Sequence, residues 1–119
     1  MIRPLRVALV GPSAAGKSTL AAALVQAGFM VRHVAQEHSY APAMWQQVSR
    51  PDVLLYLDAE LSALQARRPS VSFGPAELAE ERRRLAHARA HCDLYLDTTG
   101  LAAEEVQRRA LAFLAELKR

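Results

Sequence analysis

GPSAAGKST, from Gly11 to Thr19, is the stretch of this sequence that decides the fold. It matches the pattern G-x-x-x-x-G-K-[ST], whose fixed positions are filled by Gly11, Gly16, Lys17 and Ser18. A short apolar run precedes the stretch and a helical pattern follows it, which is the context that a phosphate-binding loop requires. Backbone N–H groups of such a loop point at a polyphosphate, and the dipole of the following helix favours its negative charge. The stretch therefore predicts a site for nucleotide phosphates.

The side chains of this loop have separate expected tasks. Lys17 can reach the β- and γ-phosphate oxygens, and the Ser18 hydroxyl can ligate the Mg²⁺ that bridges them. Thr19 is expected near the α-phosphate. The whole run is expected to hold the nucleotide, namely Gly11, Pro12, Ser13, Ala14, Ala15, Gly16, Lys17, Ser18 and Thr19. The alternative is a Gly-rich turn between strand and helix that binds nothing, and the agreement of pattern and context disfavours it.

Length and composition indicate a single globular domain, residues 1–119. The chain has 119 residues, enough for one domain and too few for a second. Hydrophobic residues make up 51% and charged residues 23%, which excludes the composition of a disordered chain. The net charge of +3 suits an anionic ligand but is too small to indicate nucleic acid by itself. The one cysteine and the lack of a membrane-spanning apolar stretch lead us to expect a cytoplasmic protein.

Strand and helix patterns alternate along the chain. Short apolar runs predict strands over residues 5–10, 29–34, 52–57 and 94–97. Helical patterns cover residues 17–26, 42–49, 61–68, 76–91 and 102–117, the last with an apolar face of Val106, Ala110, Phe113, Leu114 and Leu117. We detect no internal repeat. The alternation predicts an α/β fold in three layers, α/β/α, of the P-loop type, around a short, mostly parallel sheet of about four strands. Ligands of such a sheet bind beyond the carboxyl ends of its strands, where Gly11 to Ser18 lie.

Three segments resemble P-loop kinases of the nucleoside and nucleotide kinase type. PDVLLYLDAELSALQARR (51–68) is similar to the strand, acidic turn and helix that lead into the lid of thymidylate and deoxynucleoside kinases. DLYLDTTGLAAEEVQRR (93–109) resembles their last strand and helix, and VAQEHSYAPAMWQ (34–46) resembles the segment with their acidic residue, Ser and Gln. The resemblance implies a shortened member of this branch of the P-loop NTPase superfamily. Much of the region that closes over the phosphate acceptor is missing, so either the acceptor site is rudimentary or a second copy or partner protein completes it.

Two acidic residues compete for the support of Mg²⁺. Asp58 follows the apolar run LLYLD and fits a simple pattern of an acidic residue after a strand. By the resemblance this strand is the later one leading to the lid, so Asp58 is interpreted as the N-cap of the next helix. Glu37 stands before Ser39 and Tyr40, in a position that resembles the catalytic acid segment, and it is preferred for Mg²⁺ support or acceptor activation. A solvated loop carboxylate is the other interpretation of Glu37.

Arginines near the expected lid are candidates for contact with the transferred phosphate. Arg67 and Arg68 stand where an arginine at the start of the lid would contact it, a task that suits a planar guanidinium. Arg82, Arg83 and Arg84 lie in EERRRLAHAR and could supply another. Charge runs of this kind are usually solvated helix faces with Glu–Arg pairs, and we expect this of at least two of the three.

These observations predict a protein that binds ATP and Mg²⁺ and acts as a small kinase-like phosphotransferase. It would move the γ-phosphoryl group of Mg-ATP to a small nucleoside or nucleotide-like acceptor through Lys17, Glu37, Arg67 and Arg68. A nucleotide-binding sensor module, or a slow NTPase that acts through a partner, is the alternative that the short chain favours. ATP is preferred to GTP because a guanine-specific N/T-K-x-D segment is absent from the sequence. Neither a membrane nor a nucleic acid is expected as a partner.

Overall fold

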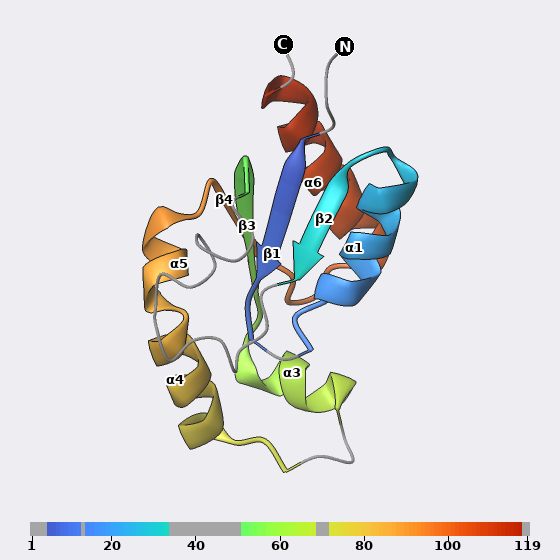
Figure 1. The fold of residues 1–119 in the computed structure, drawn as a ribbon. Coiled ribbons are helices and arrows are strands. Elements are labelled where there is room, and N and C mark those ends of the chain that lie inside the picture. Colours follow the sequence, from blue (N-terminus) through green and yellow to red (C-terminus); the bar gives the residue numbers. More distant parts are fainter. Residues whose placement is uncertain (1–4, 13, 34–50, 69–71, 118–119) are drawn as a thin grey trace.

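The computed structural model describes residues 5–12, 14–33, 51–68 and 72–117, and within them a parallel sheet in the order β2-β1-β3-β4 (Figure 1). Its strands are β1 (Arg6–Val10), β2 (Met30–His33), β3 (Val53–Asp58) and β4 (Leu94–Asp97). The helices are α1 (Lys17–Gln26), α3 (Leu61–Arg67), α4 (Pro75–Arg84), α5 (Ala86–His91) and α6 (Ala103–Leu117). All three strand pairs are parallel, so the predicted α/β fold with a short parallel sheet is confirmed.

Helices cover both faces of the sheet. α1 and α6 lie on one face and α5 on the other, whereas α3 lies beyond the carboxyl ends of the strands (Figure 1). The larger core, under α1 and α6, includes Val7, Leu9, Leu20, Leu24, Leu55, Leu57, Val106, Ala110 and Leu114. The smaller core, under α5, is formed by Ala8, Val10, Leu54, Tyr56, Leu85 and Ala88. Alternate residues of β1 and β3 enter opposite cores, which explains why both strands are continuous apolar runs in the sequence.

The tetrapeptide LYLD occurs in both β3 and β4, and the two copies pair in register. Each residue lies opposite its counterpart: Leu55 and Leu94, Tyr56 and Tyr95, Leu57 and Leu96, Asp58 and Asp97. The two tyrosine rings stack with their centroids 5.8 Å apart. A shared tetrapeptide is far shorter than the units of a repeat protein, and the register alone shows that its two copies are neighbours. The pairing brings Asp58 and Asp97 together at the carboxyl edge of the sheet.

The helices differ from the prediction in two places. The single helix expected over residues 76–91 is divided at Leu85, where α4 ends and α5 begins. Leu85 is buried in the smaller core, and the division there lays α5 on the sheet while α4 extends past the strand ends (Figure 1). Leu117 was expected on the core face of α6 but is 47% exposed. The last buried residue of this helix is Leu114. No helix in the described parts of the chain is long and apolar enough to span a membrane.

The helix expected over residues 42–49 lies outside the described residues. α1 ends at Gln26, as expected. Gly28 follows the helix with a φ of 98°, a left-handed conformation that glycine adopts readily.

Candidate functional site

The loop between β1 and α1 starts at Gly11, a position that excludes any side chain. Its φ is 149°, and a Cβ atom built on it would lie 1.9 Å from the carbonyl oxygen of Leu57 in β3. Since β1 and β3 are neighbours in the sheet, the chain leaves β1 by passing directly against the backbone of β3. Gly11 is the first fixed glycine of the sequence pattern. The structure shows that the close approach is to protein backbone.

The Lys17 side chain folds back over this loop. Its Nζ atom donates a hydrogen bond to the carbonyl oxygen of Gly11 at 2.6 Å. Burial lowers the pKa of Lys17, whereas the carboxylate of Glu81 in α4 raises it. An anion beside a partly buried ammonium group offsets the cost of its desolvation. Lys17 is therefore placed to interact with negative charge at the end of β1.

Among the described residues, no side chain caps the first turn of α1. Its N-cap residue is Gly16, with φ 108° and ψ 14°, and the first helical hydrogen bond to it comes from the N–H of Leu20. The N–H groups of the first turn consequently point out of the helix toward the loop. The side chains of Ser18 and Thr19 are exposed at the same place. This helix end carries partial positive charge that suits an anion such as a phosphate.

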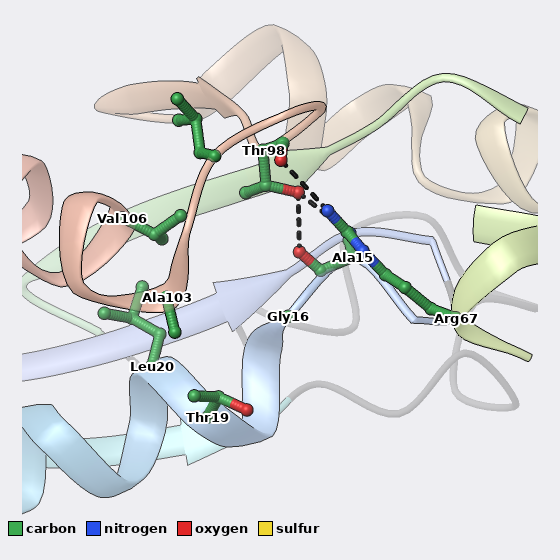
Figure 2. A pocket seen from close by; sticks show the side chains of 9 residues that line it. Ala15, Gly16, Thr19, Leu20, Arg67, Thr98, Ala103 and Val106 are labelled. Atoms are coloured by element: carbon green, nitrogen blue, oxygen red, sulfur yellow. Dashed lines mark hydrogen bonds between the residues drawn. The ribbon is translucent and has the colours of Figure 1, made fainter. Parts of the chain in front are cut away.

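Arg67 of α3 and Thr98, which follows β4, join the loop to the carboxyl edge of the sheet (Figure 2). Arg67 donates from Nη1 to the Ala14 carbonyl oxygen and from Nη2 to the Thr98 carbonyl oxygen, both at 2.9 Å. The buried Thr98 hydroxyl donates to the Ala15 carbonyl oxygen at 2.9 Å and accepts from Arg67 at 3.1 Å. Thr98 was not among the predicted site residues. Its signal in the sequence is its position directly after a strand.

A cavity of about 190 Å³ lies beside the loop. Its lining consists of Ala15, Gly16, Thr19, Leu20, Arg67, Thr98, Leu101, Ala103 and Val106. Figure 2 shows Leu20, Ala103 and Val106 on one side and Arg67 on the other. The cavity is therefore a mainly apolar hollow with a guanidinium at its edge, next to the first turn of α1.

Asp58 does not cap α3, so its interpretation as an N-cap is wrong. The N-cap residue is Glu60, which makes no side-chain cap bond. Asp58 is 7% exposed, and its two carboxylate oxygens accept hydrogen bonds from Arg82 at 3.0 Å and from the Tyr95 hydroxyl at 2.9 Å. A carboxylate this deeply buried requires such donors. Asp58 thus connects β3 with β4 and α4.

The other arginine candidates lie apart from the loop. Arg68 follows α3 and lines a separate, open hollow along α4. Arg83 and Arg84 both form ion pairs with Glu80, at 2.6 and 3.0 Å. These two therefore match the expected solvated Glu–Arg pairs, whereas Arg82 reaches inward to the end of β3. Arg67 is the arginine that the structure brings to the loop.

Ser13 and Glu37 lie outside the described residues. Among the residues that are described, no group of three or more His, Cys, Asp or Glu side chains could hold a metal ion. Mg²⁺ that is bound together with nucleotide phosphates takes only one or two ligands from the protein and keeps several waters. The exposed Ser18 hydroxyl at the first turn of α1 fits this limited requirement.

The architecture around this loop is a P-loop-like α/β fold. A solved structure with the same fold is that of the YorR protein from Bacillus subtilis in complex with phosphorylated GDP. The TM-score is 0.62 at 16% sequence identity, and the match covers 95% of this chain and 96% of YorR. The likeness at this identity concerns the fold, and it extends over nearly all of both chains. No protein-family model matches the sequence, and neither does any curated protein.

Proposed function

We propose that this chain, as one domain, binds a nucleoside triphosphate and Mg²⁺ at the loop from Gly11 to Thr19 and transfers the γ-phosphoryl group to a small acceptor. The observation that carries the proposal is the meeting of three features in one place. These are the Lys17 ammonium, the uncapped first turn of α1 and the apolar cavity beside them. The first two suit phosphates, and the third suits the base.

The phosphate part of the proposal rests on charge and on backbone direction. A triphosphate at the first turn of α1 accepts hydrogen bonds from N–H groups that already point toward the loop. The same phosphates supply an anion to Lys17. The Ser18 hydroxyl would hold the Mg²⁺, which neutralises phosphate charge when it is bound. These residues orient the phosphates and stabilise charge on the γ-phosphoryl group, which is most of what phosphoryl transfer requires from a protein.

The base part rests on the cavity. Apolar side chains of Leu20 and Val106 line it, and the Arg67 guanidinium forms one edge (Figure 2). A planar guanidinium stacks favourably on an aromatic ring. The cavity adjoins Thr19, so a ring held there can remain joined to phosphates at the start of α1. Arg67 thus contributes to base binding in this proposal, in addition to the phosphate contact expected for it.

YorR supports nucleotide binding, since a chain of this fold and similar extent has been crystallised with phosphorylated GDP. We retain ATP as the preferred nucleotide because of the resemblance to nucleoside and nucleotide kinases, and GTP as the competitor. Glu37 is proposed as the acid that supports Mg²⁺ or the acceptor. A second copy of the chain or a partner protein is proposed to complete the acceptor site.

Thermal unfolding with ATP or GTP, each with Mg²⁺, tests nucleotide binding. A ligand that binds only the folded state, at a free concentration of about 100 times its Kd, adds about 2.7 kcal/mol to the free energy of unfolding. We expect such a shift in wild type and its loss in Lys17→Ala. Arg83→Ala, which removes an exposed ion pair with Glu80, is the control and should keep the shift. If neither nucleotide moves the melting temperature of wild type, the proposed binding is wrong.

Labelled ATP and GTP offered with nucleosides and nucleoside monophosphates test transfer. Label should move to at least one acceptor in wild type and remain on the nucleotide in Glu37→Gln. Binding without transfer to any acceptor would instead favour the alternative of a nucleotide sensor or slow NTPase.

A further inference from the structure

A buried threonine after β4 is held in place beside the phosphate loop. Thr98 is only 2% exposed. Its backbone N–H donates to the Asp58 carbonyl oxygen at 2.8 Å, and its carbonyl oxygen accepts from the N–H of Leu101 at 3.1 Å and from Arg67. Both backbone groups of Thr98 are therefore bonded, which fixes the place of its hydroxyl at the carboxyl edge of the sheet.

The Thr98 hydroxyl is bonded to the loop. Its oxygen lies 2.9 Å from the carbonyl oxygen of Ala15 (Figure 2) and 3.2 Å from that of Asp58. The same oxygen accepts a hydrogen bond from Nη1 of Arg67 at 3.1 Å. A hydroxyl has one proton to donate, and the shorter contact identifies the Ala15 carbonyl as its main acceptor. A single side chain thus ties one peptide group of the loop to the end of β4.

This bond sets the direction of the next N–H group. No cis peptide bond occurs in the described residues, and the C=O and N–H groups of a trans peptide point in opposite directions. Since the Ala15 carbonyl is directed at Thr98, the N–H of Gly16 points away from Thr98. Gly16 has a left-handed conformation and Lys17 begins the right-handed α1. Consecutive residues of these two conformations gather their N–H groups into a concavity that binds anions.

We infer that Thr98 is a positioning residue for the phosphates, which acts by holding the peptide between Ala15 and Gly16 so that its N–H faces them. This inference rests on the proposed function, which supplies the phosphates. Without the hydroxyl, the Ala15 carbonyl loses the partner that sets its direction, and the peptide is able to rotate. A rotated peptide turns a carbonyl oxygen toward the phosphates, and the negative charge on both groups makes this unfavourable.

The neighbouring residue offers a matched control. The Thr99 hydroxyl accepts a hydrogen bond from the N–H of Glu60 at 2.7 Å, so it ties the same end of the sheet to the start of α3. Thr98→Val and Thr99→Val each remove one hydrogen-bonded hydroxyl and keep the branched shape of the side chain. If the Thr98 hydroxyl only supports the fold, the two substitutions should affect ligand binding alike. If it positions the loop, Thr98→Val alone should weaken binding.

Calorimetric titration with inorganic tripolyphosphate, ATP and GTP, each with Mg²⁺, tests this inference. Tripolyphosphate has no base, so its affinity reports on the loop and not on the cavity that Thr98 also lines. We expect Thr98→Val to weaken binding of tripolyphosphate and of the nucleotide by about five-fold or more, because one hydrogen bond is lost and a carbonyl group is released. Thr99→Val should bind as wild type does. Thr98→Ser keeps the hydroxyl and should keep the affinity.

The N–H resonance of Gly16 gives a readout that a general loss of stability would not move. In ¹⁵N-labelled protein, saturating tripolyphosphate should shift this resonance in wild type, in Thr98→Ser and in Thr99→Val. The shift should be much smaller in Thr98→Val. Circular dichroism shows whether each variant is folded. Thr98→Ala removes the same hydroxyl from a smaller side chain and replaces Thr98→Val if that variant does not fold.

The outcomes separate the two proposals. Wild-type affinity of folded Thr98→Val for tripolyphosphate and nucleotide would overturn the inference and leave nucleotide binding standing. Equal weakening by Thr99→Val would also overturn it, because loss of any hydroxyl at this end of the sheet would then suffice. Weak binding by Thr98→Ser would overturn it as well, since that variant retains the bonded group. If wild type binds neither tripolyphosphate nor a nucleotide, the proposed function is wrong and the inference falls with it.

Discussion

Nη1 of Arg67 donates a hydrogen bond to the carbonyl oxygen of Ala14 at 2.9 Å, across 53 positions of the sequence. Ala14 has a φ of 69°, a left-handed conformation that is uncommon for residues other than glycine. The side chain of a later helix therefore holds the carbonyl group of a loop residue with an uncommon backbone conformation. The same guanidinium also holds Thr98, so α3 secures the loop and the end of β4 together.

Removal of this guanidinium should destabilise the fold. Arg67→Ala takes away the donor to the carbonyl oxygens of Ala14 and Thr98, and we expect the free energy of unfolding to fall by about 1–3 kcal/mol. Arg68→Ala is the matched neighbour and should change it by less than about 0.5 kcal/mol. Urea denaturation of both variants measures the difference. Equal losses would show that Arg67 does not anchor the loop.

A methyl group at Gly11 should be far more damaging than one at another glycine of positive φ. Gly11→Ala places a Cβ atom 1.9 Å from the Leu57 carbonyl oxygen, and we expect a loss of more than about 3 kcal/mol. Gly28 has a φ of 98°, but a Cβ atom built on it meets nothing within 4 Å. Gly28→Ala should therefore cost only the backbone strain of about 1–2 kcal/mol. Chemical denaturation compares them. Similar costs would mean that the contact with β3 relaxes easily.

Filling the cavity beside the loop should weaken binding of the base and spare the phosphates. Ala103 is exposed at the start of α6 and lines this cavity, so Ala103→Leu can fill it without disturbing the core. We expect about ten-fold weaker binding of the nucleotide and nearly unchanged binding of inorganic tripolyphosphate, by calorimetry. Ala102→Leu changes the preceding exposed residue and is the control. If Ala103→Leu weakens tripolyphosphate equally, the cavity does not hold the base.

The Tyr95 hydroxyl should make the fold sensitive to alkali. Burial and the hydrogen bond to Asp58 raise the pKa of Tyr95 from 10.0 to about 12. The folded state thus holds this proton more firmly than the unfolded chain does. This contribution to stability is complete below pH 10 and is lost as the pH rises through about 12. Between these values the melting temperature of Tyr95→Phe should fall less steeply than that of wild type, and parallel curves would contradict this.

The fold was predictable where the signals were local. The apolar runs of β1 and β3 fall on strands because both faces of the sheet are covered, which leaves no polar alternation in the sequence. The division of the helix at Leu85 was not predictable from the sequence. Helical hydrogen bonds are formed on both sides of Leu85, so both parts share one helical pattern. Packing of Leu85 into the smaller core decides that break, and packing is not visible in the helical pattern.

The candidate site was predictable in its loop and not in the groups around it. The fixed spacing from Gly11 to Ser18 identifies the loop without any knowledge of its neighbours. The partners of Asp58 lie 24 and 37 positions away, at Arg82 and Tyr95. Their contact depends on strand register and on the placement of α4, and neither follows from spacing along the chain. For the same reason the pattern could not distinguish Arg67 from Arg68.

The in-register LYLD pair has a consequence for association between chains. Identical side chains in register on parallel strands are also the arrangement of stacked segments in a fibril. Another copy of the segment added beside β4 would extend the row of tyrosines favourably, but it would also add a third carboxylate to Asp58 and Asp97. Arg82 and the Tyr95 hydroxyl already donate to Asp58. We therefore expect the negative charge at the end of each segment to disfavour edge-to-edge assembly at β4.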